Sequence, residues 1–286
     1  MKQDKIKQLF EGRILIIATK HNKEKVIAPA LEKFLGVKCK VAENFDTDSL
    51  GTFTGEIERT EDPFTTAKNK CLLAMEINNC DLAIASEGSF RPHPTFGFIY
   101  VDDEILLFVD KKNNLEIGIR ELSIETNFNA LEISTEEELI EFANSVKFPS
   151  HALILRKSRN DNSDIIKGIT DWKLLKNSFN ELKCKYGVVY IETDMRAMNN
   201  PTRMKVIEGA AERLAIKIST CCPNCNVAGF GITAAKPGLP CSLCGFPTRS
   251  TLAYEYKCKA CNFIEEKQFP DGKRDEDPTY CDICNP

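Results

Sequence analysis

The chain has 286 residues, of which 42% are apolar, and its 38 Lys and Arg against 42 Asp and Glu give a formal net charge of −4. This length predicts about two domains, and no apolar run approaches the roughly 20 residues of a membrane-spanning helix. The acidic balance excludes a polycation held to nucleic acid mainly by counterion release.

Strand and helix patterns alternate through residues 1–218 and predict an α/β domain with a mixed sheet. The predicted strands of its first half are 13–18, 37–41 and 81–85, then three antiparallel strands at 96–101, 105–110 and 115–124, with turns at Asp102-Asp103 and Asn113-Asn114. The first two predicted helices are 22–34 and 62–78.

The second half of this domain continues the alternation. Its predicted helices are 135–145, 171–184 and 200–218, and its predicted strands are 151–156 and 188–192, with a polar loop at 158–163. We therefore expect the α/β domain to end at residue 218.

Residues 219–286 are predicted to form a tandem zinc-ribbon domain, because they hold four Cys-x-x-Cys pairs. The pairs are Cys222/Cys225, Cys241/Cys244, Cys258/Cys261 and Cys281/Cys284. Two pairs supply the four thiolates of a tetrahedral site, so the region predicts two structural Zn²⁺ ions. Sequential pairing, the first pair with the second and the third with the fourth, is the simplest arrangement, and a cross-braced one is the alternative. Gly or Asn follows each second cysteine, as a left-handed turn favours.

Other uses of these cysteines fit the sequence less well. Disulfides are typical of secreted proteins, and the first residues, Met1-Lys-Gln-Asp-Lys, carry no apolar signal segment, so we expect a cytoplasmic protein. Iron–sulfur clusters use more compact or less regular spacings. Four thiolates per ion leave no open position for zinc catalysis. From Ser219 onward there are 7 basic and 8 acidic residues, which disfavours nucleic acid as a partner.

Polar residues follow the apolar strands, where open α/β sheets place their sites. Asn22 and Lys25 lie at a helix start after the first strand and are candidates for binding phosphate. Two arginines, Arg196 and Arg203, flank the start of the last helix and suit a phosphate or a carboxylate.

Carboxylates form a second kind of candidate. Glu61 and Asp62 lead into a helix that also carries Lys68 and Lys70, and Glu87 is predicted to stand at a strand end beside a glycine turn. Oxygen ligands of this kind suit Mg²⁺, and a carboxylate there could also serve as a general base.

Nearly the whole chain is similar to a little-characterised bacterial family in which a domain of unknown function precedes cysteine-pair zinc ribbons. The segments that carry the resemblance are residues 18–31, 50–64, 85–94, 124–128, 148–154 and 192–204, with the later CPNC and GLPCSLCG. This resemblance implies the two-part architecture and no particular reaction.

Residues 13–110 also resemble the nucleotide pyrophosphatases that hydrolyse inosine and xanthosine triphosphates. The matching motifs, in the order of that family, are Asn22-x-x-Lys25, Glu61-Asp62, Ala67-Lys68-Asn69-Lys70 and Glu87-Gly88. The resemblance implies phosphate binding by Asn22, Lys25, Lys68 and Lys70, and Mg²⁺ binding by Glu61, Asp62 and Glu87. The chain departs from the pattern at Thr65-Thr66, where some relatives have carboxylates.

Two functions follow as hypotheses. One is a Mg²⁺-dependent hydrolase of nucleotides or other phosphorylated small molecules, with structural zinc ribbons. The alternative is a non-enzymatic ligand-binding or adaptor protein whose ribbons contact a protein or nucleic-acid partner.

Overall fold

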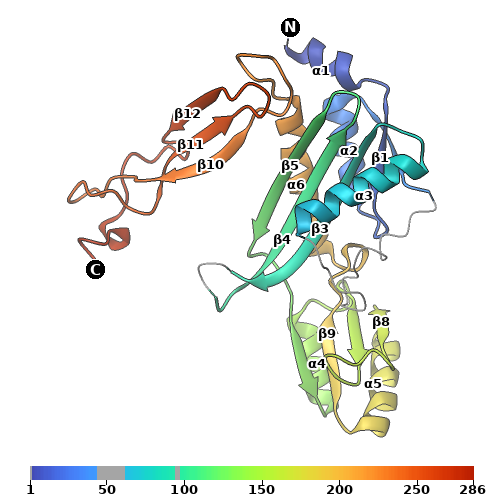
Figure 1. Cartoon of the computed structure of the whole chain (residues 1–286). Coiled ribbons are helices and arrows are strands. Elements are labelled where there is room, and N and C mark those ends of the chain that lie inside the picture. Colours follow the sequence, from blue (N-terminus) through green and yellow to red (C-terminus); the bar gives the residue numbers. More distant parts are fainter. Residues whose placement is uncertain (1, 44–61, 94–96) are drawn as a thin grey trace. The chain divides into compact units, whose positions relative to one another are not determined.

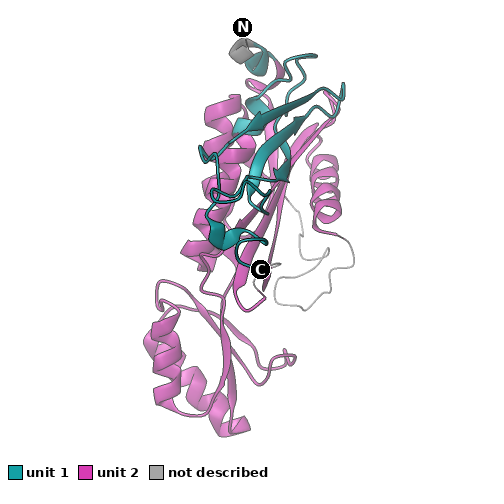
Figure 2. Cartoon of the chain, turned by 90° about the vertical axis from the view of Figure 1, so that its left-hand side faces the viewer, with its two compact units in different colours: residues 1–8, 216–286 teal, residues 9–215 magenta. Residues whose placement is uncertain are grey.

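The computed structural model describes residues 2–43, 62–93 and 97–286. They divide into two compact units, one of residues 9–215 and one that joins residues 1–8 to 216–286 (Figure 2). Helices α1 (Lys2–Phe10) and α6 (Pro201–Ser219) contribute residues to both units. Within the described ranges, no helix is long and apolar enough to cross a membrane.

The larger unit contains a five-stranded mixed sheet in the order β2-β1-β3-β4-β5 (Figure 1). Its strands are β1 (Ile14–Ala18), β2 (Lys38–Val41), β3 (Leu82–Pro92), β4 (Tyr100–Asp110) and β5 (Leu115–Ser123). Strand β1 is parallel to both β2 and β3, with Ala18 level with Ala85, and the β3-β4 and β4-β5 pairs are antiparallel. The predicted α/β class with a mixed sheet is confirmed.

Helices cover both faces of this sheet (Figure 2). On one face, α3 (Pro63–Ile77) buries Ala67, Cys71 and Ala74 against small and apolar side chains of β1, β3 and β4. Small side chains let a helix approach a sheet closely, which favours dense packing. Helix α2 (Glu24–Leu35) and the part of α6 in this unit lie on the other face.

The helix starts follow from local chemistry. Asp62 caps α3, because its Oδ1 accepts hydrogen bonds from the backbone N–H groups of Phe64 and Thr65 at 3.0 and 3.2 Å, and Pro63 occupies the first turn. Helix α2 begins at Glu24 rather than at the predicted Asn22, whose φ of 58° is left-handed. Asn is one of the few residues that adopt this conformation readily.

Residues 130–193 form a second sheet, of four antiparallel strands in the order β6-β9-β7-β8. They are β6 (Ala130–Ile133), β7 (Leu153–Arg156), β8 (Ile166–Ile169) and β9 (Val189–Thr193), with helices α4 (Glu136–Ser145) and α5 (Trp172–Tyr186). Phe142 and Phe179 are nearly fully buried in the core that these helices share with the strands. The sequence predicts only β7 and β9. Strand β7 is as short as β6 and β8 but is a continuous, fully buried run, whereas β6 and β8 are partly exposed and each is interrupted by a charged residue.

Strands β3 and β4 are longer than predicted, and this changes the site. Each has 11 residues, and they pair without interruption from Leu82↔Asp110 to Pro92↔Tyr100. The predicted turn at Asp102-Asp103 is therefore wrong, and so is the predicted strand end before Glu87. Charged residues break the apolar pattern of both strands, yet the fold buries several of them against charges from other segments of the chain, which sequence periodicity does not reveal.

The smaller unit is built on a three-stranded antiparallel sheet in the order β10-β11-β12. Its strands are β10 (Ile232–Pro237), β11 (Thr251–Lys257) and β12 (Ile264–Gln268). One cluster of aromatic residues, around the buried Phe230, packs against cysteines beside this sheet. A core this small rarely folds a domain without a further constraint.

Candidate functional site

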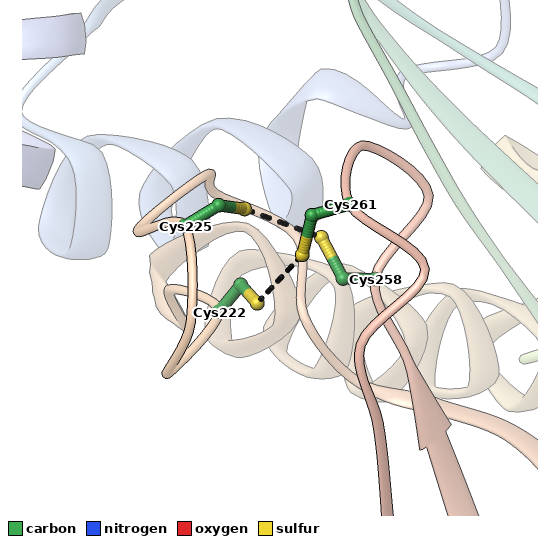
Figure 3. A group of neighbouring side chains, drawn as sticks. All are labelled: Cys222, Cys225, Cys258 and Cys261. Carbon is green, nitrogen blue, oxygen red and sulfur yellow. Dashed lines mark hydrogen bonds between the residues drawn. The ribbon is translucent and has the colours of Figure 1, made fainter.

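The eight paired cysteines form two groups of four in the smaller unit. Within each group the sulfur atoms all lie within 4.8 Å of one another. The first centre is Cys222, Cys225, Cys258 and Cys261, and the second centre is Cys241, Cys244, Cys281 and Cys284. In the first centre the two pairs come from separate loops and point toward one another (Figure 3).

The sulfur–sulfur distances fit one tetrahedral ion in each centre. The Cys222–Cys261 and Cys225–Cys258 distances are 3.7 and 3.6 Å, and in the second centre the Cys241–Cys284 distance is 3.9 Å. A zinc ion bound at about 2.3 Å by four thiolates separates its ligands by roughly 3.8 Å. A disulfide would need about 2.05 Å. Each centre can therefore hold a metal ion, and the arrangement is consistent with zinc.

The strand order decides which pairs meet. In an antiparallel sheet, the start of β10 lies beside the end of β11 and the start of β12, as the register Ile232↔Tyr256 and Lys257↔Ile264 shows. The first pair precedes β10 and the third joins β11 to β12, so both lie at this end. The second and fourth pairs lie at the opposite end, and strands of six or seven residues separate the ends by roughly 20 Å.

The simplest pairing predicted from the sequence, first with second and third with fourth, is therefore wrong. Consecutive pairs are carried to opposite ends of the sheet, and the cross-braced alternative is the one the structure adopts.

The four Cys-x-x-Cys loops share one backbone hydrogen bond, in which the residue after the second cysteine donates to the carbonyl of the first. The donors are Asn226, Gly245, Asn262 and Asn285, each at 2.9 Å. The first three have φ of 60°, 72° and 58°, as their residue types predict. Asn285 does not adopt a positive φ. Its side chain instead donates to the Thr279 carbonyl at 2.9 Å.

Nearby donors favour the thiolate form that a metal needs. The Asn224 side chain donates to the Cys261 sulfur at 3.5 Å and, with a backbone N–H, lowers the pKa of that thiol to about 6. Backbone N–H groups of Cys244 and Leu243 lower the pKa of Cys241 to about 7. By contrast, a hydrogen bond with the neighbouring Cys244 sulfur raises the pKa of Cys284 to about 12, and a bound divalent cation would favour the thiolate instead.

A second polar region lies in the larger unit, at the carboxyl ends of the parallel strands β1 and β3. Helix α2 follows β1 and α3 precedes β3 on the opposite face, so these strands flank the switch point where open α/β sheets bind ligands. Lys23 is buried here and donates to the Ser86 hydroxyl at 2.9 Å. Burial, and then the positive charge of Arg203, lowers the pKa of Lys23 to about 8.

Two buried ion pairs lie on opposite faces of the sheet at this point. Lys70 of α3 contacts Glu87 at 2.5 Å on one face, and Arg203 of α6 contacts Glu104 at 2.6 Å on the other. Gly88 lies opposite Glu104, and a Cβ there would approach Arg203 Nη2 to 2.1 Å. Only glycine leaves room for the Arg203–Glu104 pair. We define the buried charge cluster as Lys23, Lys70, Glu87, Asp102, Glu104 and Arg203.

Among the described residues, Asp102 is the acidic member of the cluster that forms no ion pair. It is 1% exposed, and no N–H or O–H group of the described residues donates to either of its oxygens. Burial, and then the charge of Glu104, raises the pKa of Asp102 to about 8. Asp102 is therefore mainly protonated at neutral pH and can donate its own hydrogen to Glu104.

Two of the predicted phosphate-binding residues meet at a cavity. Asn22 and Lys25 line a space of 310 Å³ together with Lys205 and the apolar start of α6. Lys68, by contrast, lies on the surface and pairs with Glu116 at 2.5 Å. Lys70 and Arg203 belong to the buried charge cluster.

The remaining predicted residues are engaged elsewhere or undescribed. Arg196 contacts the fully buried Asp194 at 2.6 Å and braces the turn before α6. Asp62 caps α3, and Glu61 lies outside the described residues. Among the described residues, the two cysteine groups are the sole sets of three or more His, Cys, Asp or Glu placed to share an ion. Magnesium binding by Glu61, Asp62 and Glu87 stays a prediction.

Sequence reasoning assigned no functional role to two members of the buried charge cluster, Asp102 and Glu104. Asp102 is hidden because its neighbour Asp103 makes the pair look like a turn. Asp102, Asp103 and Glu104 are consecutive and precede an unbroken apolar run, so β4 shows no alternation from which their burial could be predicted.

An α/β unit followed by a unit with two cross-braced four-cysteine centres defines the class of this protein. The chain belongs to a family described as Domain of unknown function (DUF6671), which matches residues 70–286. The match includes all eight metal-site cysteines and five of the six residues of the buried charge cluster, and it leaves Asn22 and Lys25 outside. A comparison with curated proteins finds no match.

Paired cysteine substitutions test the cross-braced arrangement. Cys222→Ser/Cys258→Ser removes two ligands from one centre, so the variant is expected to keep one ion per chain. Cys222→Ser/Cys241→Ser removes one ligand from each centre, so both ions are weakened and fewer than one is expected to remain after dialysis against a chelator. Elemental analysis of the purified proteins gives the counts. If the pairs were sequential, Cys222→Ser/Cys241→Ser would instead keep one ion per chain, and Cys222→Ser/Cys258→Ser would keep fewer than one.

Asp102→Asn tests the buried carboxyl group. The folded state holds the Asp102 proton up to about pH 8, whereas an unfolded aspartate loses it near pH 4, so wild-type stability falls as pH rises between these values. Asn does not titrate, so its advantage over Asp is expected to grow by roughly 2 kcal/mol from pH 6 to pH 8. Urea unfolding followed by the fluorescence of Trp172, the single tryptophan, measures this.

Asp110→Asn is the matched control on the same strand. Asp110 is equally buried, but hydrogen bonds from Arg13 and Asn113, together with the charge of Arg13, outweigh the effect of burial and hold its pKa below the usual value. This substitution is expected to destabilise the protein at both pH values. An Asp102→Asn effect that does not change with pH would contradict the assignment.

Proposed function

We propose that the larger unit binds a phosphorylated small molecule in the cavity beside α2 and α6. The observation that carries this proposal is the meeting of Asn22, Lys25 and Lys205 around one cavity at the carboxyl end of β1. Its volume of 310 Å³ is at the lower end of the range of about 300–1,000 Å³ for ligand sites.

The lining suits a molecule with one anionic and one apolar part. Lys25 and Lys205 supply two positive charges against the one negative charge of Glu208, and Met198 and Met204 supply adaptable apolar surface. Pro201, the first residue of the 19-residue helix α6, also lines the cavity, so the positive end of the helix dipole adds to the attraction for phosphate.

The cavity and the buried charge cluster are built from the same two segments. Lys23 lies between Asn22 and Lys25, and Arg203 lies between Pro201 and Met204. A ligand that moves either segment therefore also moves a member of the buried charge cluster, Lys23 or Arg203. Perturbed ionisable groups beside a cavity at a switch point are typical of functional sites.

Hydrolysis of a phosphoanhydride bond is the reaction we propose to test at this site. It would consume one water and release phosphate or pyrophosphate, with a divalent cation to neutralise the phosphates. Support comes from the order of the motifs between Asn22 and Gly88, which resembles their order in the nucleotide pyrophosphatases that hydrolyse inosine and xanthosine triphosphates. The non-enzymatic alternative is supported by the engagement of Asp62 as a helix cap and of Glu87 with Lys70.

For the smaller unit we propose two structural Zn²⁺ ions, in keeping with a reducing cytoplasmic setting. Four thiolates complete the coordination of each ion and leave no position for substrate. Binding energy of this kind is also folding energy, which a unit with so small a core needs.

Lys25→Gln tests the ligand site. Loss of one phosphate contact is expected to weaken binding of nucleoside triphosphates about 10-fold, with the fold intact because Lys25 is exposed. Titration calorimetry over a panel of nucleotides and sugar phosphates, with and without Mg²⁺, gives the affinities, and phosphate release assays report turnover.

Lys68→Gln is the matched control, since Lys68 is a surface lysine paired with Glu116 and does not line the cavity. Binding without turnover would favour the non-enzymatic function. Equal weakening by both substitutions, or no binding by the wild-type protein to any ligand of the panel, would contradict the proposed site.

A further inference from the structure

The two metal centres differ in what they show to solvent. In the second centre, Leu243 lies between Cys241 and Cys244 and is 74% exposed, and Ile283 lies between Cys281 and Cys284 and is 59% exposed. The corresponding positions of the first centre are Pro223, Asn224, Lys259 and Ala260, which carry no large apolar side chain.

Aromatic residues repeat this contrast. Phe246 and Tyr280 flank the second centre and are 45% and 66% exposed. Beside the first centre, Phe230 is buried and packs with Tyr256 and Phe263 in a small core. We define the apolar tip as Leu243, Phe246, Tyr280 and Ile283.

The second centre does not need apolar side chains at these four positions to hold its structure. The second centre is held by its thiolates, by backbone hydrogen bonds such as Ser242 N–H to the Glu276 carbonyl at 2.9 Å, and by the buried Leu239. Single exposed apolar residues are ordinary. Four of them on the two loops of one metal centre are a local concentration of exposed apolar side chains, which is typical of interaction sites.

The charge around the apolar tip selects the partner. Residues 239–250 contain one basic side chain, and residues 269–286 contain two basic and five acidic side chains. The two segments together therefore carry a net charge of −2. Four thiolates and one divalent ion add −2, which gives −4 in total. Phosphate backbones and anionic lipid surfaces would be repelled. Two copies meeting tip to tip would bring −4 against −4.

We propose that the apolar tip is a docking surface for a basic amphipathic segment of a partner protein. Bulky apolar side chains of that segment would cover Leu243 and Ile283, and its Lys or Arg side chains would face the acidic surroundings. The pair of Asp282 with Arg249 is highly exposed and weak, so Asp282 can exchange its partner for a basic side chain. This proposal does not depend on the ligand proposed for the larger unit.

Selection from a displayed library of random peptides tests the surface, because it lets the protein choose among many segment chemistries. The target is the full-length chain loaded with Zn²⁺, and the comparison target is Leu243→Ser/Ile283→Ser. The control is Ala260→Ser, at the corresponding position of the first centre. All three proteins must retain two ions per chain by elemental analysis.

The selected peptides are expected to combine Lys or Arg with bulky apolar residues. Their affinity is expected to fall at least 10-fold with Leu243→Ser/Ile283→Ser, to fall with added salt, and to stay unchanged with Ala260→Ser. The proposal is overturned if no peptide depends on Leu243 and Ile283, or if the dependent peptides are acidic. It is also overturned if the same substitutions instead abolish self-association or binding to RNA or anionic vesicles.

Discussion

The alternation of antiparallel strands determines how the smaller unit is held together. Each strand carries the chain to the other end of the sheet, so consecutive Cys-x-x-Cys loops are separated and alternate ones meet. An ion bound at each end would join loops that are distant in sequence, 33 to 43 residues apart by their sulfur contacts. Because each ion would close a long loop, metal binding would contribute the stability that the few buried aromatic residues cannot supply.

In the larger unit the main constraint is the burial of charged side chains at the edge of the sheet where the parallel strands β1 and β3 end. Glu104 and Glu87 are each matched by a basic residue from a helix, which limits the large penalty for burying ions. Asp102 has no such match and keeps its proton instead. A fold selected only for stability would favour a neutral residue there, which supports our proposal that this edge is the functional part of the unit.

Strong local signals in the sequence predicted the class of fold, the metal-binding cysteines and several helix starts. Asp62 and Thr135 cap helices as their residue types predict, and Asn226 and Asn262 adopt left-handed turns. Features that depend on contacts distant in sequence were not predicted. The pairing of the cysteines requires the strand order, and Asp102 looks like a turn residue until the surrounding charges are placed.

Cadmium substitution gives the most direct test of the cross-braced centres. In protein loaded with ¹¹³Cd, proton–cadmium correlation spectra connect each ion to the β-protons of its own cysteines. We predict two cadmium signals, one coupled to Cys222, Cys225, Cys258 and Cys261, and the other to Cys241, Cys244, Cys281 and Cys284. A cadmium signal coupled to both Cys222 and Cys241 would contradict the account.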